Sequence, residues 1–526
     1  MHKHSSIRMA VSAAALAWTP VAATQAQTLA VGVPAPITSI DPHYHTLTPN
    51  IELDAHIFEP LIDMDSTSHI KPALAESWRL VDERTWEFKL RPAKFQDGSD
   101  FTAEDVVSTI NRIPNVKNSP GSFLIYTRPI TSMEIVDPHT VRMHTAGVYP
   151  LLPIDLSNVD IISHKLGTSP ATEDFNSGKD AIGTGPFRFV SYRAGDRVEL
   201  ERNDGYWGEK PQWQHVDYRV ISNDGARTAA LLAGDVQLIA AVPTTDVARL
   251  RQDSRVRIAE TVSLRIIYLG LDQSRDAAPA EVTGPNGEKL DHNPLKDQRV
   301  REALSIAINR PAIVERVMEG LAIPSRQFLP PGSFSYVPDL KLPAYDPTRA
   351  KALLAEAGFP NGFRITLHGP NDRYINDSRI IQAVGQMWTR VGVQTSVESL
   401  TFPSFIGHAN KQDYAAFLLG WGSSTGEASD PLRSLVATFS TEKGWGAANR
   451  GRYSNAAVDA LIDKALGTAD DAAREKVLIE AERLVFSDVG IIPLHNQMNV
   501  WATRADLAYT PRTDEETRAQ EVRAAK

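Results

Sequence analysis

The stretch Ile182–Gly208, IGTGPFRFVSYRAGDRVELERNDGYWG, constrains the fold more than any other part of the chain. Its Gly-Thr-Gly-Pro at 183–186 predicts a turn, because glycine permits positive φ and proline fixes its own φ. Two runs of alternating residues, 187–192 and 197–201, predict a β-hairpin after that turn. We expect the Tyr-Trp pair at 206–207 to close the edge of a hydrophobic core.

The order GTGPF, Arg-Asn and Tyr-Trp resembles the peptide/nickel-binding family of bacterial extracellular solute-binding proteins, family 5. These are the large periplasmic receptors of ABC importers. Further segments that resemble the family follow in its order: Ser39–Ile62, Leu74–Arg112, Asp297–Arg310, Tyr345–Gly362 and Ile491–Asn496. Together they cover roughly the whole chain that follows residue 26.

The resemblance implies an α/β fold of two lobes, the type II periplasmic-binding-protein fold of the cluster C kind, with an additional small inserted domain. We place lobe I at 28–55, 182–265 and 490–526, the inserted domain at 56–181, and lobe II at 266–489. Closure of the lobes is expected at two crossing strands, near Leu264–Leu271 and Ile491–Leu494.

The residues themselves also predict alternating helices and strands, which favours mixed α/β lobes over a sandwich. Asp346-Pro347 begins a helix that ends at Gly358, since aspartate caps and proline suits the first turn. Further helices are predicted at about 378–391, 454–466 and 472–486. A capping box from Thr102 to Asp105 opens another.

The first 26 residues have the pattern of a secretory signal peptide. Lys3 and Arg8 precede an apolar run at 9–18, and small residues at 22–26 suit cleavage after Ala26. Removing the two cations would lower the formal net charge of −9 by two, so a nucleic-acid partner is not expected. No other segment has about 18 uninterrupted apolar residues, so we expect a periplasmic protein without a membrane span.

The chain has no cysteine, which excludes disulfides, thiolate metal sites, a cysteine nucleophile and a lipid-bearing cysteine. The spacing of the histidines at 43, 45, 56 and 69 does not complete a metal site. Neither a P-loop nor a dinucleotide-binding glycine motif is present. We therefore expect no cofactor or metal, and place ATP hydrolysis in a partner chain.

An enzymatic alternative rests on Gly422–Gly426, GSSTG, which matches the G-x-S-x-G nucleophile elbow after an apolar strand. The elbow needs a helix directly after its serine, here Ser424. Asp430-Pro431 delays the helical pattern, so we expect a protein that is not an enzyme.

The resemblance also supplies candidate ligand contacts at the two charged ends of a peptide. Peptide-binding relatives place an aspartate three residues after the tryptophan equivalent to Trp421, where it pairs with the ligand's ammonium group. This chain has Ser424 there, so either Glu427 or Asp430 serves, or the ligand lacks a free amino terminus. For the ligand's carboxylate, Arg373 or Arg379 fits, because arginine offers a charged planar fork.

Further contacts are expected where an extended ligand adds like a strand to exposed backbone. The candidates, again by resemblance, are Thr46, Leu47 and Thr48, then Phe123 or Tyr126, then Gly420, Trp421 and Gly422, with Trp421 and Trp445 as cavity walls.

The sequence therefore predicts a monomeric periplasmic substrate-binding protein that captures peptides or peptide-like solutes and delivers them to an ABC transporter permease and, through it, an ATPase. The alternatives are a receptor for an opine, an oligosaccharide or chelated nickel, and a secreted serine hydrolase using Ser424.

Overall fold

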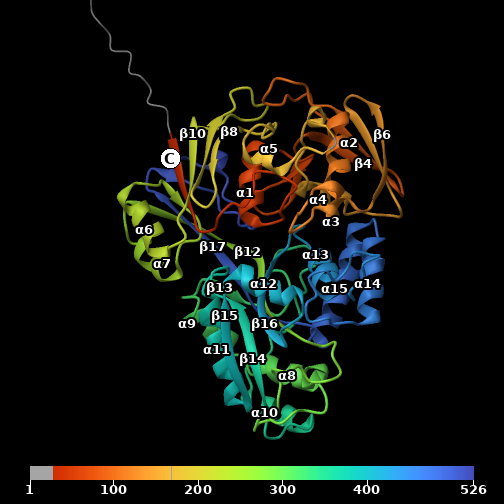
Figure 1. The fold of residues 1–526 in the computed structure, drawn as a ribbon, viewed down its shortest axis with the longest axis vertical. Helices are drawn as coiled ribbons and strands as arrows, with labels where there is room; N and C mark the ends of the chain where they lie inside the picture. The colour runs from red at the N-terminus through yellow and green to blue at the C-terminus, as the bar shows by residue number, and fades with distance from the viewer. Residues whose placement is uncertain (1–27, 168, 526) are drawn as a thin grey trace, which may run out of the picture.

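Two long antiparallel strands, β12 (Val256–Leu271) and β17 (Ile492–Arg504), join the two lobes of the protein. The structure is a computed structural model and describes residues 28–167 and 169–525. The predicted signal peptide at 1–26 lies outside the described residues. In Figure 1 the first lobe and the inserted segment lie above these strands, and the second lobe lies below them.

One sheet of 11 strands continues through both lobes in the order β15-β14-β16-β12-β17-β11-β1-β10-β9-β8, and β13 pairs with β17 beside this path. On the side of the first lobe the strands are β1 (Thr28–Val33), β8 (Phe187–Arg193), β9 (Arg197–Arg202), β10 (His215–Val220) and β11 (Leu238–Ile239). On the side of the second lobe they are β13 (Ala322–Pro324), β14 (Phe363–Pro370), β15 (Val393–Leu400) and β16 (Ala416–Gly422).

The segment between β1 and β8 builds a separate antiparallel sheet in the order β4-β5-β7-β6, with its own hydrophobic core. Its strands are β4 (Ala75–Asp82), β5 (Thr85–Leu90), β6 (Ile130–Asp137) and β7 (Thr140–Thr145), next to the short pair β2 (Ile62–Met64) and β3 (Ile70–Pro72). Its helices are α2 (Ala103–Arg112), α3 (Leu124–Thr127), α4 (Leu152–Asp155) and α5 (Thr172–Asn176).

The remaining helices cover the large sheet and flank the lobe junction (Figure 1). Those of the first lobe are α1 (Thr48–Ile57), α6 (Asp224–Ala233) and α7 (Thr244–Leu250). Those of the second lobe are α8 (Gln298–Ile306), α9 (Arg310–Arg316), α10 (Pro347–Glu356), α11 (Asp377–Arg390), α12 (Phe402–Asn410), α13 (Ser429–Pro431), α14 (Ala456–Leu466) and α15 (Asp471–Ser487). A short pair, β18 (Leu507–Ala508) and β19 (Arg523–Ala524), lies near the C-terminus.

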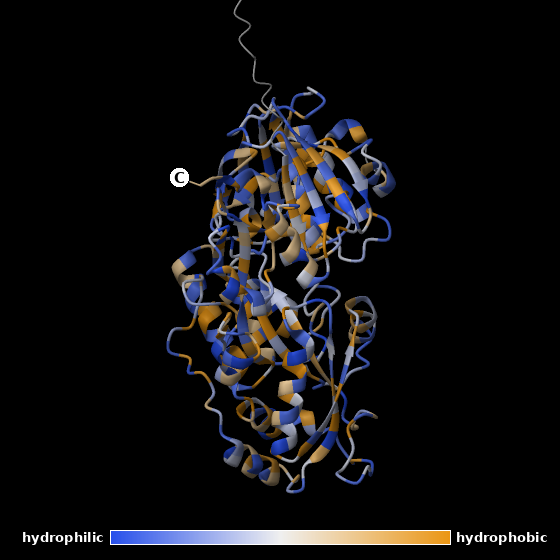
Figure 2. Cartoon of the chain, turned by 90° about the vertical axis from the view of Figure 1, so that its left-hand side faces the viewer, coloured by the Kyte–Doolittle hydropathy of each residue, from blue (hydrophilic) through white to orange (hydrophobic). Residues whose placement is uncertain are grey.

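Burial of apolar strand residues stabilises the lobes. Figure 2 shows orange segments along strands of both lobes, next to blue ones. Ile266, Ile267 and Leu269 of β12 are all at most 1% exposed. The predicted division into lobe I, inserted domain and lobe II stays a prediction. No helix in the described ranges is long and apolar enough to cross a bilayer.

The local predictions from the sequence are confirmed with small shifts of bounds. The hairpin is β8 and β9, in register from Phe187 opposite Arg202 to Arg193 opposite Arg197. The helices expected at 346–358, 378–391, 454–466 and 472–486 are α10, α11, α14 and α15. Thr102 and Asp105 form the capping box of α2.

The reason given for the glycines at 183 and 185 is wrong. Neither has a positive φ; instead, both lie against the end of α1. A Cβ added to Gly183 would lie 1.9 Å from the Ile57 carbonyl oxygen, and one on Gly185 would lie 2.7 Å from the His56 oxygen. Close backbone approach therefore requires these glycines.

Candidate ligand-binding site

A cavity of about 130 Å³ lies where the two lobes meet. The first lobe contributes the ends of β1 and β11 and the start of α1, and the second lobe contributes the loop before α11. Its polar lining consists of Thr48, Glu52, Arg265, Arg373, Gln497, Asn499 and Glu515. Apolar and aromatic surface, including Tyr218, Tyr374 and Trp501, forms much of the rest. A concave, largely apolar site with a few polar groups is typical of a small-molecule site.

Arg265 and Glu515 form a buried ion pair on one wall of this cavity. Arg265 projects from β12, and its Nη2 lies 2.7 Å from Glu515 Oε2, while its Nε donates to both carboxylate oxygens at 2.9 Å. Burial alone would raise the pKa of Glu515, but the guanidinium outweighs it and the pKa ends below its ordinary value. The charge of Arg265 is thus already compensated within the protein.

Arg373 provides a second guanidinium in this cavity, and it has no ion-pair partner among the described residues. Its centre lies 5.5 Å from the ring of Tyr374 and 5.4 Å from that of Phe402. Among the described residues, no carboxylate forms an ion pair with its side chain. Burial lowers the pKa of Arg373 and the nearby Arg265 lowers it further, yet an arginine stays charged at neutral pH. This cation is therefore available to an anionic ligand group.

The structure separates the two arginines that the sequence offered for a carboxylate. Arg373 lies in the loop before α11 and lines the cavity, whereas Arg379 lies on the exposed face of α11. Asp377 fixes the loop, because its carboxylate accepts hydrogen bonds from the backbone N–H groups of Arg373 and Tyr374, both at 3.0 Å.

Thr46 and Leu47 directly precede α1, and Thr48 is its first residue. The N–H of Thr46 already donates to the Gly121 carbonyl at 3.1 Å. Leu47 is the residue before α1. Thr48 lines the cavity and accepts a hydrogen bond of 3.4 Å from Arg265 Nη2.

Gly420, Trp421 and Gly422 form the end of β16. Gly420 accepts a hydrogen bond from the Tyr374 hydroxyl at 3.2 Å, and Gly422 pairs with Arg265 across the sheet. This strand end therefore lies beside two residues that line the cavity. Trp421 donates through Nε1 to Asp430 Oδ2 at 3.0 Å.

Neither acid proposed for a ligand ammonium is free of protein contacts. Glu427 is buried and accepts a hydrogen bond of 3.0 Å from Arg474. Asp430 accepts from Trp421 and, at 3.1 Å, from the N–H of Ser424. Their ligand contacts stay predictions, and this structure gives both carboxylates a structural partner.

The geometry gives no support to the serine-hydrolase alternative. Among the described residues, no histidine or carboxylate side chain forms a hydrogen bond with the Ser424 hydroxyl, whereas a nucleophile needs a base in contact with it. The next helix, α13, begins only at Ser429.

Phe123, Tyr126 and Trp445 are buried within hydrophobic cores. Phe123 and Tyr126 pack with ring centroids 6.1 Å apart in the inserted segment. Trp445 is 8% exposed, with Lys443 Nζ at 4.2 Å from its ring. Phe123 also lines a second cavity, beside α1.

The sequence did not single out several residues that line the cavity: Glu52, Tyr218, Arg265, Tyr374, Gln497, Asn499, Trp501 and Glu515. Arg265 could have been found, because a lone charge interrupts the apolar run Leu264–Leu271. Glu515 lies in an acidic C-terminal stretch without a distinguishing pattern, and only the fold brings it to the cavity.

Two α/β lobes joined by crossing strands, with polar groups from both lobes lining the space between them, define the class of two-lobed solute-binding proteins. The sequence profile described as "Bacterial extracellular solute-binding proteins, family 5 Middle" matches residues 69–443. The chain belongs to this family, and the predicted resemblance is confirmed.

Individual relatives extend the similarity over nearly the whole chain. The glutathione-binding protein GsiB of Escherichia coli strain K12 is 27% identical over 510 residues, which cover 94% of this chain and 93% of GsiB. The periplasmic binding protein DppA from Helicobacter pylori, solved in complex with the peptide STSA, has a TM-score of 0.81 at 23% identity, covering 95% of this chain and 98% of DppA. NikZ from Campylobacter jejuni, in complex with Ni(L-His), has a TM-score of 0.80 at 22% identity, covering 94% of this chain and 99% of NikZ. The predicted fold class is confirmed.

Proposed function

We propose that this protein captures a peptide or peptide-like solute that carries a carboxylate, encloses it between its two lobes, and delivers it to the permease of an ABC importer. We place the protein in the periplasm as a monomer, exported through the segment 1–26. Relatives named for binding glutathione, a peptide and a nickel–histidine complex support this class of solute.

The guanidinium of Arg373, which lines the cavity without an ion-pair partner among the described residues, is the observation that supports a carboxylate ligand. Arg265, which lines the same cavity, is neutralised by Glu515, so it adds little net attraction for an anion. A carboxylate that reached Arg373 would gain charge-assisted hydrogen bonds in a site partly removed from water. An uncharged oligosaccharide could not form such charge-assisted hydrogen bonds. The site therefore favours peptides over sugars, with opines and amino-acid metal complexes as the alternatives.

Replacement of each arginine separately tests this proposal. We expect Arg373→Ala to weaken binding of a carboxylate ligand by about 10- to 100-fold, the loss of a charged hydrogen bond. Isothermal titration with glutathione, trialanine and trialanine amide measures this change. Removal of the peptide's carboxylate as the amide is expected to weaken wild-type binding by a similar factor.

The exposed Arg379 provides the matched control on the same segment. Arg379→Ala is expected to leave the affinity within about twofold of wild type, since the side chain faces solvent. Unchanged affinity in Arg373→Ala, with trialanine and its amide binding alike, would contradict the proposal. Mass spectrometry of solutes that co-purify with the protein then identifies the natural ligand.

A further inference from the structure

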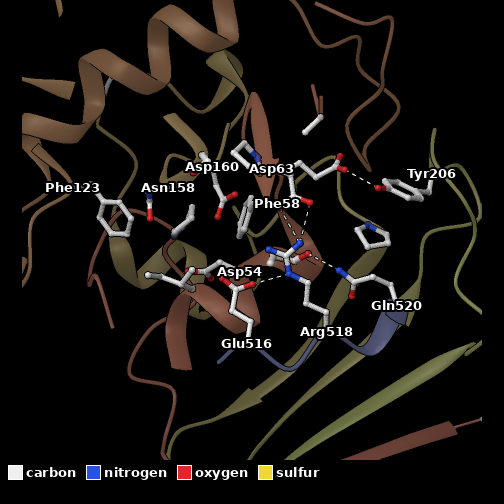
Figure 3. Close-up of a pocket in the computed structure, with 18 residues that line it drawn as sticks. Asp54, Phe58, Asp63, Phe123, Asn158, Asp160, Tyr206, Glu516, Arg518 and Gln520 are labelled. Carbon is white, nitrogen blue, oxygen red and sulfur yellow. Dashed lines mark hydrogen bonds and ion pairs between the residues drawn. The ribbon is translucent and has the colours of Figure 1, made fainter. Parts of the chain in front are cut away.

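A second cavity, of about 70 Å³, lies against a different face of α1 from the cavity between the lobes. Asp54 and Phe58 face it from the end of α1, Asp160 from the segment after η2 (Leu156–Asn158), and Glu516 and Arg518 from the C-terminal segment. Figure 3 shows the acidic side chains converging on this space from several elements. The site is therefore assembled by the fold and not by one local motif.

The charge of this cavity is strongly unbalanced. Its lining includes the five carboxylates of Asp54, Glu59, Asp63, Asp160 and Glu516. The one basic lining residue, Arg518, is bound to two of them: its Nη1 lies 2.9 Å from Asp63 Oδ1, and its Nε lies 2.7 Å from Glu516 Oε2. Three carboxylates are left without a cation.

Glu59 is satisfied by neutral donors. Thr184 Oγ1, Tyr206 Oη and Trp207 Nε1 each donate to its carboxylate at 2.8 Å. Burial raises the pKa of Glu59 to about 7, and these hydrogen bonds oppose the rise. These three donors all belong to the segment 182–208, which therefore fixes the position of the Glu59 carboxylate. Glu59 needs no further hydrogen-bond partner.

Asp54 and Asp160 lack such partners. Asp54 is 2% exposed, and its Oδ1 has no hydrogen-bond partner in the part of the chain that the structure describes. Neither carboxylate forms an ion pair within residues 28–167 and 169–525. A buried acceptor without a donor is costly, and native proteins rarely leave one unmet. Asp54 therefore presents an unmet acceptor to the cavity, and the half-buried Asp160 lines the same space.

The surroundings of this pair favour a protonated state when the cavity holds no cation. Burial raises the pKa of Asp54 well above its ordinary value, and the charges of Asp160 and Asp41 raise it further. Burial raises the pKa of Asp160 to about 8; Glu516, Asp63 and Glu59 raise it and Arg518 opposes them. Asp41 is itself paired with Arg112 and lies next to His43, whose ring contacts the Asp160 carbonyl. A cation that entered would reverse this balance and release protons.

The chemistry of the lining narrows the kind of cation. In the described ranges, no three histidine, cysteine or carboxylate side chains are grouped as metal ligands would be. The walls are instead aromatic and proline-rich, with Phe58, Phe123 and Tyr206 beside the acids. Apolar and aromatic walls with carboxylate acceptors suit an organic ammonium group, which brings several N–H donors and a short carbon chain. The cavity has room for a group of roughly two water molecules in size.

We propose that this cavity binds the ammonium group of a primary amine, with Asp54 and Asp160 as its carboxylate acceptors. The cavity reaches the lobe junction, because Asn158, which lines it, donates to the Ser424 carbonyl of the second lobe at 3.5 Å. The ammonium therefore has two possible sources: the captured solute itself, or a free small amine.

Two titrations of the full-length mature protein test this proposal. Methylammonium chloride is titrated at constant ionic strength, with tetramethylammonium as the bulkier control that has no N–H donors. Trialanine is compared with N-acetyl-trialanine, which lacks the ammonium. Each titration is repeated in two buffers of different ionisation enthalpy, so that proton release on binding is measured directly.

Binding of methylammonium but not tetramethylammonium, with proton release, supports a free amine as the ligand. At least about tenfold weaker binding of N-acetyl-trialanine supports the ammonium of the solute. In either case Asp54→Asn is expected to reduce the preference for the ligand with N–H donors over its control by at least about tenfold. Asp204→Asn, at an exposed position, is expected to leave this preference unchanged. Circular dichroism shows whether the variants are folded.

If wild type does not distinguish either pair of ligands, the proposal is overturned, and this result requires no variant. The proposal is also overturned if Asp54→Asn is folded and keeps the full preference for the ligand with N–H donors. The proposal of a carboxylate ligand at Arg373 can fail independently of the proposal of an ammonium site, because Arg373→Ala is not expected to change methylammonium binding.

Discussion

At the scale of single residues, buried ionisable groups set how the stability of this protein responds to pH. Glu482 in α15 is fully buried, and its carboxylate accepts one long hydrogen bond of 3.5 Å from the Phe328 N–H. Burial raises the pKa of Glu482 to about 8 from an ordinary value of 4.5. The folded state thus holds a proton that the unfolded state releases, and stability falls as pH rises between these two values.

Glu482→Gln should remove this dependence. Between about pH 6 and about pH 8, we expect the free energy of unfolding of wild type to fall by about 2 kcal/mol more than that of the variant. Urea denaturation at both pH values measures the difference. Glu480→Gln, on the exposed face of the same helix, should follow the wild type. Parallel pH dependence of wild type and Glu482→Gln would show that Glu482 ionises normally.

Part of the candidate site could be predicted from the residue types in the sequence, and the other residues could be identified only from the fold. Arg373 and Arg379 are equally plausible in the sequence, six positions apart. Their roles differ because the loop before α11 faces the cavity while the first turn of the helix turns Arg379 to solvent. Glu515 and Asp54 carry no local pattern that separates them from surface acids.

At the scale of secondary-structure elements, contacts between the inserted segment and the second lobe hold the two sides together. Arg433, between α13 and α14, donates to the Tyr149 hydroxyl at 2.6 Å and to Asp155 Oδ1 at 3.0 Å. The side chains of Arg433 and Asp155 are buried, and Tyr149 is half-buried. Burial raises the pKa of Asp155, and the positive charge of Arg433 opposes that rise. The pair exists only while the lobes are in contact.

Asp155→Asn should favour the open arrangement, because it leaves the charge of Arg433 buried without its counter-ion. We expect solute affinity to fall by about tenfold or more, although Asp155 lines neither of the two cavities described above. The exposed Arg128, which donates to the Thr441 carbonyl at 3.3 Å, provides the control. Arg128→Ala should change affinity by less than about threefold, as expected for an exposed contact. Equal affinity of Asp155→Asn and wild type would rule out this contribution to closure.

The sequence predicted elements whose determinants are local and missed those whose determinants are distant. α10 begins at the Asp346 cap, and α2 begins at its capping box, because the hydrogen bonds that start a helix lie within three or four residues. The pairing of β12 with β17 joins residues more than 200 positions apart, so no local pattern records it. The family resemblance, and not periodicity, supplied the crossing strands.

At the scale of the whole molecule, closure depends on how the crossing strands bend. The ladder between β12 and β17 is interrupted between Val262 and Ile266 and again between Ile267 and Tyr268. These irregularities fall in or next to the predicted hinge at Leu264–Leu271, where a break in pairing allows rotation of one lobe against the other. Across the junction, Asn376 Nδ2 donates to Thr244 Oγ1 at 3.0 Å, a contact that opening would break.

The most direct test of the central claim, that a solute is enclosed between two moving lobes, is small-angle X-ray scattering of the mature protein. The radius of gyration is compared after removal of bound solute by partial unfolding and refolding, and again after the co-purified solute is added back. The account predicts a larger radius without solute and contraction to the arrangement described above when it is restored. An unchanged radius, with solute bound at full occupancy, would contradict capture by closure.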